Sequence, residues 1–153
     1  MSVLLSRREL AFRAIEGLFR GHSYFALAVR NREMLLEECN DFPFALLNDG
    51  GESNPDQQTQ QLLLRAELEI DVGVKAAYRD EVVSELNRAR AEAFDALMGG
   101  WQASDAAGTL LANVEYRGCA APMLAVDGSA RGAMTLLFAM TYVQHELDAY
   151  AAG

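Results

Sequence analysis

Hydrophobic and polar residues alternate along residues 62–75, LLLRAELEIDVGVK. Every second position is apolar: Leu62, Leu64, Ala66, Leu68, Ile70, Val72 and Val74. Most positions between them are charged: Arg65, Glu67, Glu69, Asp71 and Lys75. Because successive side chains of a β-strand point to opposite faces of its sheet, the pattern predicts a strand with one buried and one charged face. At ~3.3 Å per residue the strand would reach about 45 Å, so we expect one end to project as an arm.

Two segments show the three- and four-residue spacing of amphipathic helices. The first covers residues 6–20, where Ser6 and Glu9 have the spacing of a capping box. The second covers residues 80–98, with Asp80 as the expected N-cap, and glycine follows both segments. The apolar stripe of the second helix consists of Val82, Val83, Leu86, Ala89, Ala93 and Leu97. We therefore expect two helices that each bury one face.

Shorter alternating segments predict four more strands, at residues 25–30, 42–47, 110–117 and 134–143. The last is apolar enough on both faces to be central in its sheet. Residues 31–40 fit a loop, a short helical turn or part of a ribbon. Residues 118–131 contain turn signals, and the tail LDAYAAG is expected to be a helical turn or a frayed end.

The predicted element order is therefore α-β-β-β-α-β-β. It indicates an α+β fold, with a mostly antiparallel sheet of about five strands and two helices packed on one face. The long strand and its predecessor would form an extended hairpin arm. The 153 residues fit one domain, covering 1–153, with a sizeable core.

A polar stretch, DGGESNPDQQTQQ at residues 49–61, separates the second strand from the long strand. Its composition predicts a mobile loop at the tip of the arm, which a partner could order on contact. The candidate contact residues there are Asp49, Glu52, Asn54, Asp56 and Gln58. Trp101 lies in a second predicted loop, residues 101–109; such a tryptophan more often packs on its own domain, and an interface anchor is the alternative.

The formal net charge is −9, which argues against a protein that reads nucleic-acid sequence, because such proteins usually carry a basic face. The first residues lack the pattern of a signal peptide, and no stretch approaches the ~18–20 apolar residues of a membrane helix. We therefore expect synthesis in the cytoplasm. Cys39 and Cys119 lack metal-site spacing and are expected to be reduced, with a disulfide or metal pair as the alternative.

No catalytic motif is complete. His145 and Glu146 begin like a zinc-protease HExxH motif, but the fifth position is Ala149. Residues 128–132, GSARG, differ from the GxSxG of a nucleophile elbow. His22 has no catalytic partner nearby in sequence, and a hydrolase would need a cleft that unites a histidine with a carboxylate and a nucleophile. The sequence predicts no catalytic, cofactor-binding or metal-binding residue, and we expect a protein that is not an enzyme.

Glu67, Glu69 and Asp71 lie on one face of the predicted long strand, with ~7 Å between successive members. Three carboxylates at this spacing can mimic a metal site. Metal binding would need further ligands, which the sequence does not show. We therefore expect a solvated acidic face.

Five segments carry a further similarity: SRRELAFRAIEGLF, FPFALL running into NDGGE, LRAELEIDVGVKA, DEVVSELNRARAEAFDAL and MTLLFAMTYV. In pattern and order they resemble the tail terminator proteins of long-tailed bacteriophages, the lambda U-like family. The resemblance covers roughly residues 6–144 and includes no catalytic motif.

The resemblance implies a structural virion protein made in the host bacterial cytoplasm. It implies a homo-hexameric ring on the head-proximal end of the tail tube, which stops tube polymerisation and presents a surface for head attachment. The implied partners are the tail tube protein and the head–tail connector or completion protein, with no cofactor and no membrane. DNA would pass through the ring without sequence-specific binding.

Within such a ring, Glu67, Glu69 and Asp71 are candidates for the lumen, because like charge discourages DNA from adhering. Two alternatives remain open. One is another phage head–tail joining, completion or tube-like ring protein. The other is a small protein-binding adaptor domain that is not an enzyme.

Overall fold

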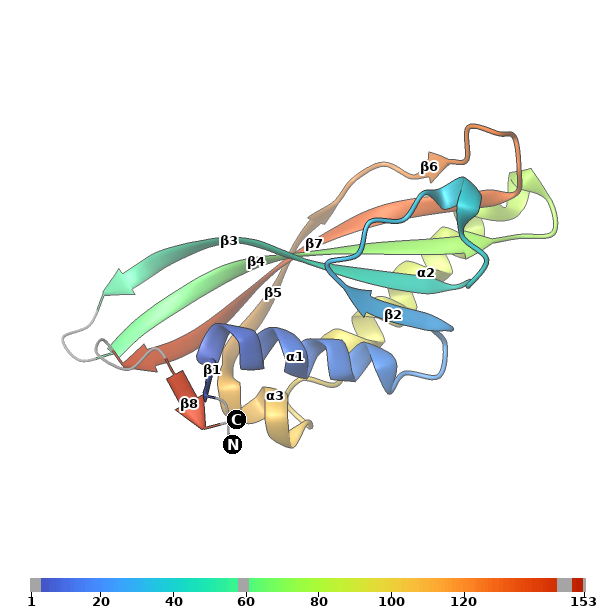
Figure 1. The fold of residues 1–153 in the computed structure, drawn as a ribbon. Coiled ribbons are helices and arrows are strands. Elements are labelled where there is room, and N and C mark those ends of the chain that lie inside the picture. The colour runs from blue at the N-terminus through green and yellow to red at the C-terminus, as the bar shows by residue number, and fades with distance from the viewer. Residues whose placement is uncertain (1–3, 58–60, 146–149, 153) are drawn as a thin grey trace.

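The computed structural model describes residues 4–57, 61–145 and 150–152. Its main sheet has the strand order β2-β3-β4-β7-β5, with a short β6 paired to β7 (Figure 1). The strands are β2 (Leu27–Arg30), β3 (Phe44–Gln57), β4 (Gln61–Lys75), β5 (Leu111–Cys119), β6 (Met123–Leu124) and β7 (Arg131–His145). The β2–β3 pair is parallel and the other pairs in this sheet are antiparallel. The predicted α+β fold and the central position of the last long strand are confirmed.

Three α-helices lie on one side of the main sheet: α1 (Arg7–Arg20), α2 (Val82–Leu97) and α3 (Asp105–Leu110) (Figure 1). α2 packs on β4 and β7, and α3 packs on α1. The core between sheet and helices includes fully buried Phe12, Ile15, Leu68, Ile70, Leu86, Leu136 and Phe138. We call the sheet face toward these helices the helix face and the opposite one the open face. None of the helices in the described ranges is long and apolar enough to cross a membrane.

The two long helices begin in different ways. Ser6 caps α1 as predicted, because its Oγ accepts a hydrogen bond from the Glu9 N–H at 3.0 Å. The predicted N-cap of α2, Asp80, is wrong: it lies in the 3₁₀ turn η2 (Arg79–Glu81), and Glu81 precedes the helix without a side-chain cap. The turn extends the helix start, since the Glu81 N–H donates to the Tyr78 carbonyl at 3.0 Å.

The polar stretch at 49–61 is mostly strand, so the prediction of a loop there is wrong. β3 continues to Gln57 and β4 starts at Gln61, which leaves residues 58–60 as the connection, outside the described residues. Two register shifts absorb extra residues, between Asp49 and Glu52 and between Ser53 and Asp56. Pro55 lies in the second, where a missing N–H is tolerated. Pairing with β4 supplies backbone hydrogen bonds that the polar composition did not reveal.

The projecting end of the long strand is three strands wide. β4 pairs with β3 on one side and, from Gln61 to Lys75, with β7 on the other. Figure 1 shows β3, β4 and β7 extending together beyond α1. The predicted two-stranded hairpin arm is therefore a three-stranded ribbon, in which β4 is paired on both edges.

The segments that periodicity left unassigned or assigned to loops have the following structures. Residues 31–43 connect the parallel strands β2 and β3 and contain the 3₁₀ turn η1 (Leu36–Glu38). Part of the predicted 101–109 loop is helix α3, which Ser104 caps. β1 (Leu4–Ser6) pairs antiparallel with β8 (Tyr150–Ala152), so the prediction of a helical or frayed tail is wrong. That pairing places residues 4–6 beside residues 150–152 (Figure 1).

Candidate functional site

The α-helices lie on one side of the main sheet and do not cover its open face (Figure 1). Along β4, the residues from Leu64 to Val74 at even positions are buried against the helices. The odd positions point to the open face and include Arg65, Glu67, Glu69, Asp71 and Lys75. Glu69 and Lys75 are exposed, whereas the other three are half-buried. The structure thus places the three predicted acidic residues on one face.

The three carboxylates of this acidic stripe are not equivalent. Asp71 accepts hydrogen bonds from Asn48 Nδ2 at 3.2 Å and from Thr135 Oγ1 at 2.5 Å. Glu67 and Glu69 have no hydrogen bond or ion pair with any residue that the structure describes. Their cross-strand neighbours on β7 are Ala139 and Leu137. Glu67 and Glu69 therefore offer free charge to a partner, while Asp71 is held by the sheet.

Asp49, predicted to contact a partner, is instead bound within the fold. Arg30 Nε donates to Asp49 Oδ1 at 2.8 Å, and Arg30 Nη1 donates to Glu9 Oε2 at 2.5 Å. The hydrogen bond from Arg30 to Asp49 is the main reason that the pKa of Arg30 is raised, and the hydrogen bond to Glu9 adds to it. Burial acts in the opposite direction. The hydrogen bond from Arg30 is also the main reason that the pKa of Glu9 is lowered. Asp49 therefore joins β3 to β2 and α1 and is not a loop contact.

Glu52 also has contacts within the fold. It accepts a hydrogen bond from Arg8 Nη1 at 3.2 Å and another from the Tyr142 hydroxyl. Burial, with a further contribution from Glu52, raises the pKa of Tyr142. The backbone after the first register shift turns this side chain to the helix face, where it is 39% exposed, so its predicted contact role stays a prediction. Of the remaining loop candidates, Asn54 and Asp56 lie in β3, and Gln58 lies outside the described residues.

Trp101 and the cysteines have structural surroundings. Trp101 is 9% exposed and belongs to the core, so the interface-anchor alternative is wrong and packing on its own domain is confirmed. Cys39 is buried with Phe44 and Leu46, and Cys119 is exposed. Both cysteines are free, which excludes a disulfide between them in this structure.

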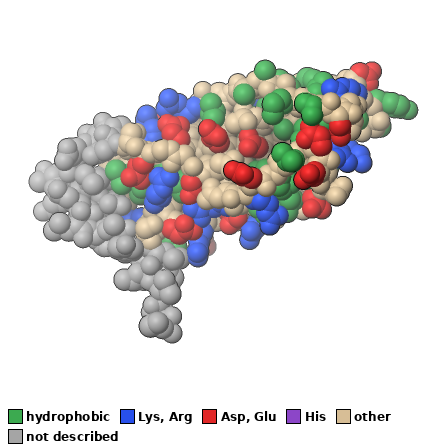
Figure 2. Space-filling model, turned by 45° about the horizontal axis from the view of Figure 1, so that its top comes forward, with side chains coloured by type: hydrophobic (Ala, Val, Ile, Leu, Met, Phe, Trp, Pro, Cys, Tyr) green, Lys and Arg blue, Asp and Glu red, His purple; other side chains and the backbone are tan. Residues whose placement is uncertain are grey.

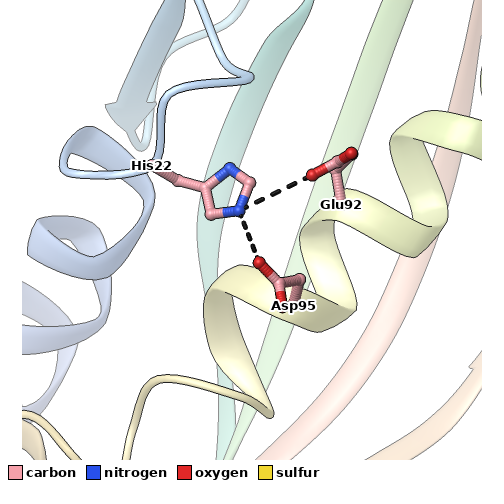
Figure 3. Close-up of side chains that lie close together, drawn as sticks. All are labelled: His22, Glu92 and Asp95. Atoms are coloured by element: carbon pink, nitrogen blue, oxygen red, sulfur yellow. Dashed lines mark hydrogen bonds and ion pairs between the residues drawn. The ribbon is translucent and has the colours of Figure 1, made fainter.

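Sequence reasoning missed one polar cluster, formed by His22, Glu92 and Asp95 (Figure 3). His22 follows α1, and the two acids lie three residues apart on α2. His22 Nε2 is 2.8 Å from Asp95 Oδ2 and 3.6 Å from Glu92 Oε2. The three donor atoms lie within 4.8 Å of one another, which is close enough to consider a metal ion. No local signal reveals this cluster, because the acids lie 70 and 73 positions after the histidine in the chain.

The surroundings of His22 favour a hydrogen bond over a metal. The Tyr24 N–H donates to His22 Nδ1 at 3.4 Å. A ring nitrogen that accepts a hydrogen bond carries no proton. In the neutral tautomer that fits this bond, Nε2 carries the proton and donates a hydrogen bond to Asp95. A metal on Nε2 would require the opposite tautomer, with the proton on Nδ1. As arranged here, the cluster ties the end of α1 to α2.

Exposed hydrophobic side chains gather at one end of the molecule. Among the described residues the large ones are Leu35, Tyr78, Val83, Met123 and Val126, with Val126 92% exposed. They lie in or beside η1, η2, the start of α2, and β6, which meet at the end opposite the β3–β4 connection (Figure 1). In Figure 2 the hydrophobic side chains concentrate toward this end. We call it the apolar end; exposed apolar patches are a common feature of interaction surfaces.

A sequence signal for the apolar end existed. Leu35, Met123 and Val126 are large apolar residues in segments without strand or helix periodicity. Such residues either pack beneath a loop or stay exposed, and periodicity does not distinguish the two.

A scan against models of known protein families finds no match for this chain, and a search of curated proteins finds none. The functional argument therefore rests on the open face, the apolar end and the similarity of segment pattern.

Proposed function

We propose that this chain is a structural subunit that caps the head-proximal end of a phage tail tube as a hexameric ring. In that role it ends tube polymerisation and provides the surface for head attachment. The similarity of segment order to tail terminators supports the proposal. The segments that carry this similarity form α1, β3, β4, α2 and β7, the elements that build the body of the fold.

The observation that carries the proposal is the open, charged face of the main sheet. A sheet with helices on only one face needs water or a partner on the other. In a ring, this face can line a water-filled channel. Glu67 and Glu69 would repel the phosphates of passing DNA there, because their charges are not neutralised by protein groups. The three-stranded ribbon supplies a projection for contact with a neighbouring subunit or the tube.

The first experiment measures the mass of the purified protein alone and with tail tubes of matching source, followed by electron microscopy of the mixture. The expected result is a sixfold ring on one tube end and tubes of fixed length. No binding and no effect on tube length would contradict the proposal. A ring that binds the head connector but not the tube would favour another head–tail joining protein. A monomer or dimer that binds neither would favour the adaptor.

Charge reversal tests the lumen. The double change Glu67→Lys and Glu69→Lys should leave ring assembly intact and slow DNA ejection, because lysines would hold phosphates in the channel. Asp71 is left unchanged because it bonds Asn48 and Thr135. The matched control is Asp80→Lys with Glu81→Lys, which changes the same charge at exposed positions away from the acidic stripe. Ejection at the same rate in all variants would remove the lumen assignment.

A further inference from the structure

A groove of about 430 Å³ lies on the open face at the apolar end. Residues 34–37 form one wall, residues 120–126 form the other, and β3, β4 and β7 form the floor. All the lining residues are apolar except Glu37, Asp71 and Thr135. The groove is therefore a largely apolar slot whose rims carry much of the exposed hydrophobic surface.

Contacts at one end hold the two walls at a set distance. Glu37 Oε1 accepts a hydrogen bond from the Val126 N–H at 3.1 Å, which joins the first wall to the second. Arg131 Nη1 donates to the Glu37 carbonyl at 2.6 Å, which joins the first wall to β7. The Arg131 guanidinium also lies over the Phe42 ring, 5.7 Å from its centroid. An occupant would meet a slot that is already formed, and such preorganisation lowers the cost of binding.

The charged residues beyond the two ends of the groove have opposite signs. Along the open face of β4, Asp71 lies in the groove, and Glu69 and Glu67 follow it toward the middle of the sheet. In the other direction the next charged residue is the exposed Lys75. Beyond one end of the slot there is thus free negative charge, and beyond the other end there is a lysine. Side chains at these alternate positions are ~7 Å apart.

We propose that the groove binds an extended segment of another protein that carries a large apolar side chain followed by basic residues at alternate positions. The apolar side chain fills the slot, and lysine or arginine side chains reach Glu69 and Glu67. An extended chain has the same ~7 Å spacing on one face, so an apolar-x-basic-x-basic pattern matches the surface in register. The polarity of the groove orients the basic end away from Lys75.

Two other occupants fit the charges less well. Nucleic acid would bring phosphates against Glu67 and Glu69. A second copy docked face to face by the same surface would bring these carboxylates toward their equivalents. The inference concerns the surface of a single chain and does not rest on ring formation. While the segment is bound, Glu67 and Glu69 pair with it, so on that chain they do not face DNA.

The test is a titration of the isotope-labelled protein, followed by amide NMR, with an acetylated and amidated peptide FSKSK. Saturable shifts confined to the two walls, the floor and the acidic stripe are expected. The peptide FSESE should bind about tenfold more weakly, as expected for two exposed ion pairs replaced by repulsion. The peptide SSKSK, which lacks the apolar anchor, should produce no saturable shift.

Variants test which residues of the groove and the acidic stripe contribute to peptide binding. Ala133→Leu fills the groove floor and should abolish the peptide shifts; Met123→Ser, at a rim position that is 67% exposed, should weaken binding without endangering the fold. Glu67→Gln with Glu69→Gln should weaken binding of FSKSK several-fold. The control Asp80→Asn with Glu81→Asn, which removes equal charge elsewhere, should bind like the unmodified chain.

Three results would overturn the proposal: no saturable shift with FSKSK, equal binding of FSKSK and FSESE, or shifts outside the groove. Shifts of the same amides with protein concentration alone would assign the groove to a second copy. Capping of tail tubes without peptide binding would leave the ring proposal standing and remove the groove proposal. Peptide binding without tube capping would remove the ring proposal and leave the groove proposal standing.

Discussion

The two faces of β4 are built by the same fifteen residues and differ in what they contribute. On the helix face, Leu68 and Ile70 are at most 1% exposed and pack beneath α1 and α2. On the open face, Glu67 and Glu69 have no partner among the described residues. Burial of apolar side chains stabilises the fold, whereas solvated charges add little to it. The helix face thus serves stability, and the open face is available for contact with other molecules.

The largest expected effect separates the faces within one strand. Ile70→Ala removes a fully buried side chain from the helix face and should lower the free energy of unfolding by about 2–5 kcal/mol. Its neighbour Glu69→Ala on the open face should change that free energy by less than about 0.5 kcal/mol. Urea denaturation of both variants measures the difference. Equal losses would show that the open face is also a packed surface.

The second comparison concerns charge on the two faces. Arg30→Met removes the cation between Glu9 and Asp49 on the helix face and should cost about 1.5–3 kcal/mol, because two partly buried carboxylates lose their partner. Arg65→Met is the matched change on the open face, where Arg65 Nη2 lies 3.8 Å from Glu115 Oε2. It should cost less than about 1 kcal/mol. The comparison fails if Arg65 proves as costly as Arg30.

The third change marks where the open face stops being a free surface. A Cβ at Gly73 would lie 2.0 Å from atoms of the Phe44 ring, so Gly73→Ala should displace that ring and cost about 1–3 kcal/mol. Gly51→Ala is the control, because a Cβ there meets nothing within 4 Å. Thermal unfolding of the two variants checks this. An undisturbed Gly73→Ala protein would mean that the Phe44 ring moves freely.

The smallest expected effect is a dependence on pH from the helix face. Arg30 lowers the pKa of Glu9 in the folded chain, so the folded state keeps this carboxylate ionised where the unfolded chain takes up a proton. Its stabilisation is therefore present above the ordinary glutamate pKa and is lost as pH falls through the lowered one. Glu9→Gln should flatten the acid side of the stability profile by less than about 1 kcal/mol.

Urea denaturation between pH 7 and pH 3 measures that profile for the unmodified chain and for Glu9→Gln. Arg30→Met should flatten the profile in the same direction, because it removes the group that lowers the pKa of Glu9. An unchanged acid slope in both variants would show that Arg30 and Glu9 are not coupled in solution.

The helices and long strands could be predicted because each is a periodic pattern in neighbouring residues. The alternation along β4, the Ser6 cap and the apolar stripe of α2 depend on side chains a few positions apart. Charged residues within such a pattern were also placed on the correct face. Val83 departs from its stripe and is 44% exposed, whereas Val82 beside it is fully buried.

The residues near the candidate sites were harder to predict, because their surroundings come from distant segments. Asp49 and Glu52 look like loop residues until Arg30, Arg8 and Tyr142 are brought against them. His22 meets Asp95 across the interface of two helices.

The sequence by itself determined that β4 has one apolar and one acidic face, since strand geometry converts alternation directly into two faces. It also determined that two amphipathic helices would cover the apolar face. Only the tertiary structure decided that residues 49–57 are strand and that residues 34–37 and 120–126 enclose a groove. Those outcomes depend on backbone pairing and on contacts between segments far apart in the chain, which no local pattern records.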